Sequence, residues 1–202
     1  MKIFCIGRNY VDHAKELNNP VPKKPLVFMK PITALLKDNR AFYYPDFSEN
    51  IHYEVELVIK MSRHAKHIDA KFAHKYYDQI GIGIDFTARD VQSQLKEKGH
   101  PWEIAKGFDH SAPISKFKSI ENFDVANINF SLNKNGEAAQ IGNSKDLIFD
   151  FSTLIAHISK YITLQKGDYI YTGTPAGVGP VKIGDKLEAY IEDELMLSCE
   201  IR

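Results

Sequence analysis

Two glutamates occupy alternate positions of an apolar, strand-like segment that runs from His52 to Ile59. Successive side chains of a strand point to opposite faces, so Glu54 and Glu56 share one face. A third carboxylate, Asp85, follows in a second apolar segment. Crowded carboxylates repel one another unless a cation lies between them, and an all-oxygen ligand set suits Mg2+. The pattern predicts a divalent-metal site, although the same alternation is typical of an edge strand with a solvated polar face.

A histidine and a glutamate lie three residues apart in a segment suited to a short helix, residues 9–17. Both side chains, of His13 and Glu16, would then share one helix face. A carboxylate beside an imidazole orients the ring and raises its basicity, which is what a general base for water requires near neutral pH. A solvated helix face carries such pairs by chance, so this spacing alone leaves both interpretations open.

Further cationic and polar residues follow these carboxylates along the chain. Arg89 and Gln92 begin a helical segment after Asp85, and Arg89 can grip a substrate carboxylate or pair with an internal acid such as Asp90. Lys106 lies among aromatic and small residues, where a lysine either meets a buried anion or extends to solvent at the rim.

A glycine-rich segment, residues 171–180, follows a strand-like run. It lacks the Gly-Lys-Ser/Thr of a P-loop and the spaced glycines of a dinucleotide fingerprint, which disfavours nucleotide binding. Its backbone amides and the Thr174 hydroxyl can approach a small anion, as can those of an ordinary tight connection.

The elements that must position these residues are mainly strands. Strand-like runs cover residues 3–6, 51–59, 79–86, 128–133, 169–172, 187–191 and 195–201, and helical segments cover 9–17, 87–98 and 150–161. Few strands are joined by long helices, so we expect a mixed, β-rich α+β fold rather than a doubly wound parallel sheet.

Length and composition restrict the class of protein. We expect one domain over residues 1–202, because this length supports a single substantial core. Acidic and basic residues balance at 26 each, which argues against nucleic-acid or membrane partners. No apolar run is long enough to span a bilayer. Cys5 and Cys199 lack metal-ligand spacing and suit a reducing compartment, so we expect a soluble cytoplasmic protein.

Six segments, taken in order along nearly the whole chain, resemble the fumarylacetoacetate hydrolase family, and most closely its short acylpyruvase and oxaloacetate decarboxylase branch. They are Gly7-Arg8-Asn9-Tyr10 with His13 and Glu16, His52 to Leu57, Asp85 to Gln92, Ala105 to Asp109, Gly142 to Asp146, and Tyr171 to Gly179. Each segment alone is weakly diagnostic, but their order and combination are specific.

The resemblance implies a mixed β-roll, barrel-like α+β fold with few short helices, assembled as a homodimer. It implies that Glu54, Glu56 and Asp85 hold Mg2+ or Mn2+; the larger members have a fourth acidic ligand, which the stretch from Phe4 to Gly7 lacks. It assigns catalytic roles to His13, Glu16 and Lys106, substrate contacts to Arg8, Arg89, Gln92 and Thr174, and a mobile lid to residues 9–31.

The reaction implied first is cleavage of the C–C bond of a 3-acylpyruvate, giving a carboxylate and pyruvate through an enolate held by the metal. Oxaloacetate decarboxylation, keto–enol tautomerisation, and isomerisation or decarboxylation of 2-oxo acids from aromatic degradation need the same enolate, and a metal-binding scaffold without catalysis is the non-enzyme alternative. Glu188 lies where larger members draw the partner of their histidine, so Glu16 and Glu188 compete; the spacing favours Glu16.

Overall fold

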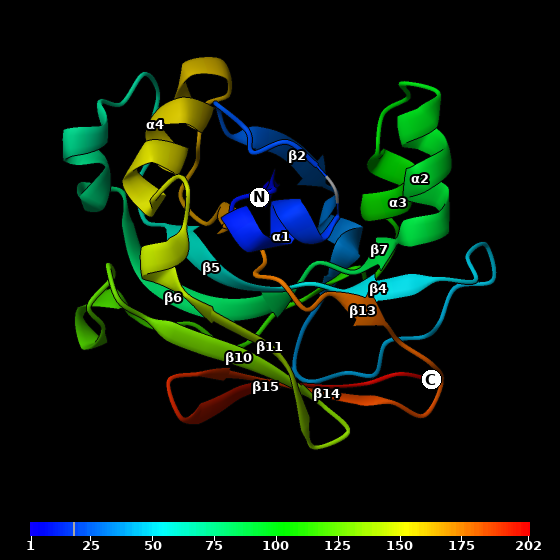
Figure 1. Cartoon of the computed structure of the whole chain (residues 1–202). Coiled ribbons are helices and arrows are strands. Elements are labelled where there is room, and N and C mark those ends of the chain that lie inside the picture. The colour runs from blue at the N-terminus through cyan, green and yellow to red at the C-terminus, as the bar shows by residue number, and fades with distance from the viewer. Residues whose placement is uncertain (18) are drawn as a thin grey trace.

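The computed structural model describes residues 1–17 and 19–202, and strands make up most of its framework (Figure 1). A six-stranded sheet has the order β2-β1-β12-β5-β6-β9, and a four-stranded sheet has the order β11-β10-β14-β15. Smaller sheets have the orders β13-β4-β7 and β3-β8. The sheets remain open in the described part of the chain, so the mixed α+β expectation is confirmed without a closed barrel.

The strands and helices have the following bounds. The six-stranded sheet contains β1 (Ile3–Gly7), β2 (Leu26–Lys30), β5 (Val55–Met61), β6 (Tyr77–Ile84), β9 (Lys118–Ser119) and β12 (Tyr169–Tyr171). The four-stranded sheet contains β10 (Asn129–Lys134), β11 (Glu137–Asn143), β14 (Lys186–Ile191) and β15 (Glu194–Glu200). The short strands are β3 (Leu35–Leu36), β4 (Ile51–Tyr53), β7 (Thr87–Ala88), β8 (Ala112–Pro113) and β13 (Gly179–Pro180). The α-helices are α1 (Val11–Glu16), α2 (Arg89–Glu97), α3 (Glu103–Lys106) and α4 (Phe151–Tyr161), and 3-10 turns cover 32–34, 70–75, 120–122 and 144–146.

The main core lies between the two large sheets. Val55, Leu57 and Ile59 of β5 belong to this core, together with apolar residues of β6, β10 and β14. Val58 on the same strand belongs instead to a second apolar cluster on the other face of the six-stranded sheet. Because β5 lies between β12 and β6 and both of its faces are covered, its alternating pattern does not mark a solvated edge strand.

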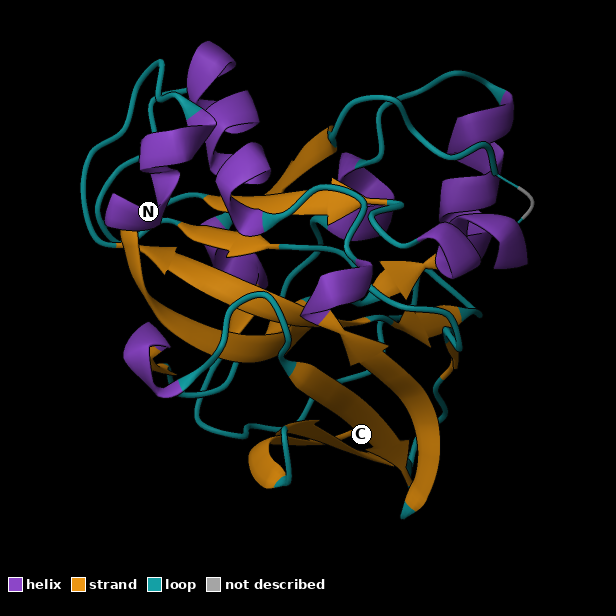
Figure 2. Ribbon diagram, turned by 60° about the vertical axis from the view of Figure 1, so that its left-hand side comes forward, coloured by secondary structure: helices purple, strands orange, loops and turns teal. Residues whose placement is uncertain are grey.

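The helices gather on the side of the six-stranded sheet that faces away from the four-stranded sheet (Figures 1 and 2). In Figure 1, α1 lies centrally above the strands, with α2 and α3 on one side and α4 on the other. Local sequence explains α4, whose cap residue Asp150 accepts a hydrogen bond from the amide of Thr153 at 2.8 Å. In the described part of the chain, no helix is long and apolar enough to cross a membrane.

Several element boundaries differ from those expected. The segment 51–59 forms two strands that meet at Glu54, because β4 pairs with β7 and β13 while β5 pairs with β6 and β12. Strand β11 and helix α3 were not expected. Within the region expected to form a lid, 9–31, Asn18 lies outside the described residues; the mobility of that region and the single-domain assignment stay predictions.

Candidate metal centre and active site

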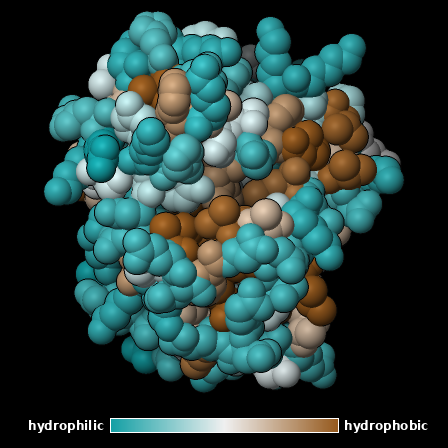
Figure 3. Space-filling model, turned by 90° about the vertical axis from the view of Figure 1, so that its left-hand side faces the viewer, coloured by the Kyte–Doolittle hydropathy of each residue, from teal (hydrophilic) through white to brown (hydrophobic). Residues whose placement is uncertain are grey.

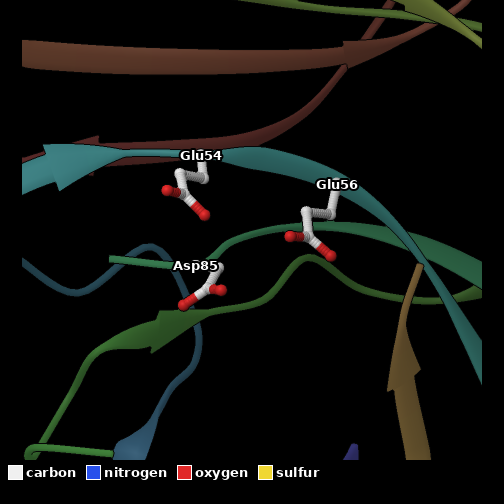
Figure 4. Close-up of side chains that lie close together, drawn as sticks. All are labelled: Glu54, Glu56 and Asp85. Atoms are coloured by element: carbon white, nitrogen blue, oxygen red, sulfur yellow. The ribbon is translucent and has the colours of Figure 1, made fainter. Parts of the chain in front are cut away.

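Three buried carboxylates converge at the end of the β5–β6 pair (Figure 4). Antiparallel pairing sets Glu56 opposite Gly83, and the amide of Asp85 donates to the carbonyl of Glu54 at 2.8 Å. One oxygen from each of Glu54, Glu56 and Asp85 lies within 4.8 Å of the others, and none of the three residues is more than 4% exposed. The structure therefore brings together the acidic residues that the sequence singled out.

A lysine ammonium lies between two of these carboxylates. Lys106 Nζ is 2.8 Å from Glu54 Oε2 and 2.7 Å from Asp85 Oδ2, and the residue is 3% exposed. It also donates to Thr87 Oγ1 at 2.5 Å. The two carboxylates raise the pKa of Lys106 despite the opposing effect of burial, so the ammonium stays charged. The alternative of a lysine at the solvent rim is wrong.

Arg89 contributes a second cation from the first residue of α2. Its guanidinium pairs with Glu54 Oε1 and donates to Gln92 Oε1 at 2.7 Å. Asp90 does not pair with it; that carboxylate accepts from Ser48 Oγ at 2.6 Å. The internal partner of Arg89 is therefore Glu54, which orients the guanidinium along one wall of the site.

The carboxylates differ in their electrostatic state. Burial by itself would raise the pKa of Glu54, but Lys106 and Arg89 outweigh burial and hold that pKa well below its usual range. Burial and the neighbouring charge of Asp85 raise the pKa of Glu56 well above its usual range, against a hydrogen bond from the Gly173 amide at 2.7 Å. Glu56 is the carboxylate that a bound cation would stabilise most.

Lys30, at the end of β2, is a buried residue of the site that the sequence analysis missed. Its Nζ donates to the carbonyls of Phe86 and Ser111 at 3.1 Å each, to the carbonyl of Lys106, and to Ser111 Oγ at 3.0 Å. It also lies 2.8 Å from Asp85 Oδ1. The only local signal is a lysine that ends an apolar run just before Pro31.

Helix α1 holds the expected histidine and glutamate pair. His13 Nδ1 lies 3.4 Å from Glu16 Oε2, and Glu16 accepts the Gly177 amide at 3.1 Å, which ties the helix to the glycine-rich loop. Burial lowers the pKa of His13, while the carboxylates of Glu54 and Glu16 oppose that shift, so the imidazole is neutral near pH 7. Glu188 instead pairs with Lys186 at 2.7 Å on β14.

A buried asparagine fixes the chain just before α1. Asn9 Nδ2 donates to the carbonyls of Thr172 and Phe149 at 2.8 and 2.9 Å. Gly173 packs so closely against it, at a φ of 109°, that a Cβ there would lie 2.6 Å from the Asn9 Cβ. The base of α1 and the start of the glycine-rich loop are thus packed as one unit.

Nine of the ten catalytic, substrate-binding and metal-binding candidates named from the sequence line one pocket, and Glu16 contacts that lining through His13. Its lining also includes Phe28 and Trp102, whose rings meet edge to face with centroids 6.0 Å apart, and Lys96 and Asn19 at its mouth. Thr174 reaches the pocket with its hydroxyl 2.8 Å from the amide of Gln140, a buried residue of β11 that the sequence analysis did not single out. The predicted members of the lining are Arg8, His13, Glu54, Glu56, Asp85, Arg89, Gln92, Lys106 and Thr174.

Comparisons with known proteins agree with this geometry. The family model described as "Fumarylacetoacetate (FAA) hydrolase C-terminal" matches residues 2–201. The chain belongs to the fumarylacetoacetate hydrolase family. Among curated family members, it is 38% identical over 200 residues to oxaloacetate tautomerase FAHD1, mitochondrial, of Bos taurus, covering 98% of this chain and 90% of that protein. It is 43% identical over 192 residues to the Arabidopsis thaliana protein of that name, covering 94% and 86%.

A solved family structure shows the same fold. Fumarylpyruvate hydrolase from Pseudomonas aeruginosa, in complex with Mn2+ and pyruvate, superposes with a TM-score of 0.94 at 32% identity, covering 100% of this chain and 89% of that one. The names of these relatives and of this neighbour are those of enzymes that act on oxaloacetate or fumarylpyruvate, which are small 2-oxo acids. This similarity supports an enzymatic role for the family member described here.

The residues present fit a divalent metal ion. The donor set consists of three buried carboxylates, and Asp85 Oδ1 accepts no hydrogen bond of good geometry in the described residues, although the Lys30 ammonium lies close to it. Oxygen-only donors suit Mg2+ and Mn2+ rather than softer metals. A cation here would relieve the repulsion between Glu56 and Asp85.

Proposed function

We propose that this protein binds Mg2+ or Mn2+ at Glu54, Glu56 and Asp85 and interconverts the keto and enol forms of oxaloacetate. The observation that carries the proposal is a buried, neutral imidazole, that of His13, in the same pocket as three buried carboxylates. Such a base can move a proton between carbon and oxygen, which is the whole of a tautomerisation. The curated relatives named oxaloacetate tautomerase support the choice of substrate.

Each residue has a separate role in this reaction. His13 takes a proton from C3 of the substrate and delivers it to the C2 oxygen. Glu16 orients the imidazole through its contact with Nδ1. The Lys106 ammonium stabilises negative charge on the enolate. Arg89 and Thr174 bind the substrate carboxylate beside the 2-oxo group. A divalent cation, when bound, supplies Lewis acidity to that group.

Hydrolysis of acylpyruvates is the second candidate, and the contact between His13 and Glu16 favours it. A carboxylate-oriented imidazole can take a proton from water, whose oxygen attacks the acyl carbonyl. The C–C bond then breaks and its electron pair forms the enolate of pyruvate, leaving a carboxylic acid. The fumarylpyruvate hydrolase of P. aeruginosa supports this reaction class.

The experiment compares both reactions in one metal-loaded preparation. We expect purified protein with Mg2+ to accelerate the change in enol absorbance of oxaloacetate beyond the metal-only rate. Acetylpyruvate and fumarylpyruvate test hydrolysis through pyruvate release, and carbon dioxide release tests decarboxylation. His13→Gln removes the base, whereas Lys98→Met, at an exposed residue after α2, is the matched control.

The outcomes separate the alternatives. Loss of tautomerisation in His13→Gln but not in Lys98→Met is the expected result. Pyruvate release from acylpyruvates without tautomerisation would favour the hydrolase instead. Metal binding without turnover of any of these 2-oxo acids would leave a metal-binding scaffold.

We also propose that the protein works as a homodimer in the cytoplasm. Apolar side chains gather in and beside a hollow on the face that looks left in Figure 1 (Figure 3), and such a surface suits a second copy. Cys5 and Cys199 are buried free thiols, as expected in a reducing compartment. Light scattering after gel filtration tests the dimer, and cell fractionation tests the location.

A further inference from the structure

Two cations at the mouth of the pocket have no carboxylate partner in residues 1–17 and 19–202. Arg8 follows β1 at a φ of 58° and is half-buried, and Lys96 lies in the last turn of α2. The Lys96 Nζ donates to Asn19 Oδ1 at 3.2 Å, which is a neutral contact. Arg89 lies in the same wall but is already paired with Glu54.

These cations belong to the lining of a single pocket. Arg8, Lys96 and Asn19 all line the pocket that holds the carboxylates. Burial lowers the pKa of Lys96, and the positive charges of Arg8 and Arg89 lower it further. The three cations therefore repel one another. Like charges held close together without an anion are unfavourable, and a bound anion relieves their repulsion.

The charge of the whole pocket points in the same direction. Its lining carries three carboxylates and four cationic side chains, and the buried imidazole adds none. A divalent ion therefore leaves three positive charges in excess. A substrate with two carboxylates reduces that excess further than a monocarboxylate does. The carboxylates are Glu54, Glu56 and Asp85, and the cationic side chains are Arg8, Arg89, Lys96 and Lys106.

We propose that Arg8 and Lys96 form a subsite for the distal carboxylate of a 2-oxo dicarboxylate, with Asn19 orienting the Lys96 ammonium. This inference rests on the proposed function, because the 2-oxo end of the substrate must lie at Glu54, Glu56 and Asp85. The subsite selects dicarboxylates over 2-oxo acids that end in a methyl or other apolar group. It also joins the segment after α1 to α2 through the contact between Asn19 and Lys96.

The test uses two ligands with the same four-carbon chain, oxaloacetate and 2-oxobutanoate, which differ in the terminal carboxylate. Binding to the Mg2+-loaded protein is read within seconds from the fluorescence of Trp102, the only tryptophan of the chain and part of the pocket lining. Lys96→Met keeps the length of the side chain and removes its charge, and Lys98→Met is the matched control two residues further on. Arg8→Gln tests the second cation.

We expect the wild type to prefer oxaloacetate by at least about tenfold, since each charge-assisted hydrogen bond to the distal carboxylate strengthens binding of the dicarboxylate alone. Lys96→Met should reduce that preference by about tenfold without changing the Kd of 2-oxobutanoate. An equal loss for both ligands, or an unchanged preference in both Lys96→Met and Arg8→Gln, would overturn the subsite.

Failure of the subsite and failure of the proposed function give different results. A preference for oxaloacetate that depends on Lys96, without its tautomerisation, supports the subsite and rejects the reaction. If the protein tautomerises oxaloacetate but neither Lys96→Met nor Arg8→Gln changes its preference for oxaloacetate over 2-oxobutanoate, the reaction is supported and the subsite is rejected.

Discussion

Lys30→Met tests whether the charge network behind the acidic residues stabilises the fold. Methionine keeps an unbranched chain of similar length but removes an ammonium that is 2% exposed. The substitution leaves the carbonyls of Phe86 and Ser111 without this donor and takes a positive charge from beside Asp85 Oδ1. Removing one of the cations that pair with a buried carboxylate strongly destabilises the folded protein.

The expected magnitude follows from these contacts. Breaking a buried ion pair costs about 3–5 kcal/mol, and Lys106 still pairs with Asp85, so we expect a loss of about 3 kcal/mol in the free energy of unfolding. For a chain of this size, that corresponds to a Tm lower by roughly 6–12 °C. Added Mg2+ should recover part of the loss, because a divalent cation at the carboxylates replaces the missing positive charge.

Calorimetry with and without Mg2+ measures both effects, and Lys23→Met, at an exposed lysine of the segment before β2, is the control. A Tm of Lys30→Met within about 2 °C of the wild type would refute the assigned role, since it would place the change within the range of ordinary surface substitutions. A large loss that Mg2+ does not reduce at all would show that Lys30 acts through packing and carbonyl contacts rather than through its charge.

Three further predictions concern the base, the metal ligand and the loop. Activity should fall on the acid side as His13 becomes protonated, at a pH below the usual imidazole range because burial lowers the pKa of His13. Because Glu16 raises that pKa, Glu16→Gln should move this acid limb of the pH–rate profile to lower pH while reducing the rate, and an unmoved limb would contradict the pairing. Glu56→Gln should stabilise the metal-free protein at neutral pH, because the raised pKa of Glu56 makes its carboxyl harder to ionise in the folded protein than in the unfolded chain, and the amide removes that cost. The variant should also abolish the rise in Tm on adding Mn2+; a retained rise would exclude Glu56 as a ligand. Gly173→Ala should lower stability by about 2–4 kcal/mol through its positive φ and its clash with Asn9, measured by urea unfolding against Gly184→Ala, whose φ is also positive but whose Cβ meets open space; equal losses would discount the clash.

The sequence predicts strands well where their own pattern carries the signal. Residues 3–6 and 187–191 fall within β1 and β14, because the continuous apolar run of the first and the apolar–polar alternation of the second are both local properties. The run 128–133 predicted β10, but the second strand of its hairpin, β11, escaped prediction although Asn135 and Gly136 carry the turn signal. Both residues adopt positive φ, as a two-residue turn between these strands requires. The sequence of β11 has no clear apolar alternation, so only the turn residues before it indicate this strand.

The site was predictable to the extent that its residues carry chemistry in short motifs. The alternation of Glu54 and Glu56 indicated either a metal site or a solvated strand, and the order of the motifs along the chain, with Asp85 among them, favoured the metal site. Lys30 was not predictable in this way, because its hydrogen-bond partners lie 56 to 81 residues away along the chain. They become its neighbours only after β2 pairs with β1. Charge compensation of a buried acid is a property of the assembled fold, so a single lysine in an apolar run gives no local sign of it.

The balance of charge around the three acids lowers the cost of burying them together. Glu54 and Asp85 contact three cationic side chains that come from β2, α2 and α3, while Glu56 accepts the Gly173 amide. Three carboxylates and three cations bring the assembled cluster close to neutral. A buried cluster near neutrality avoids most of the cost of isolated charges. Adding a divalent cation then makes the pocket positive, and an anionic substrate restores the balance. Metal and substrate should therefore each strengthen the binding of the other, because each compensates the charge that the other brings.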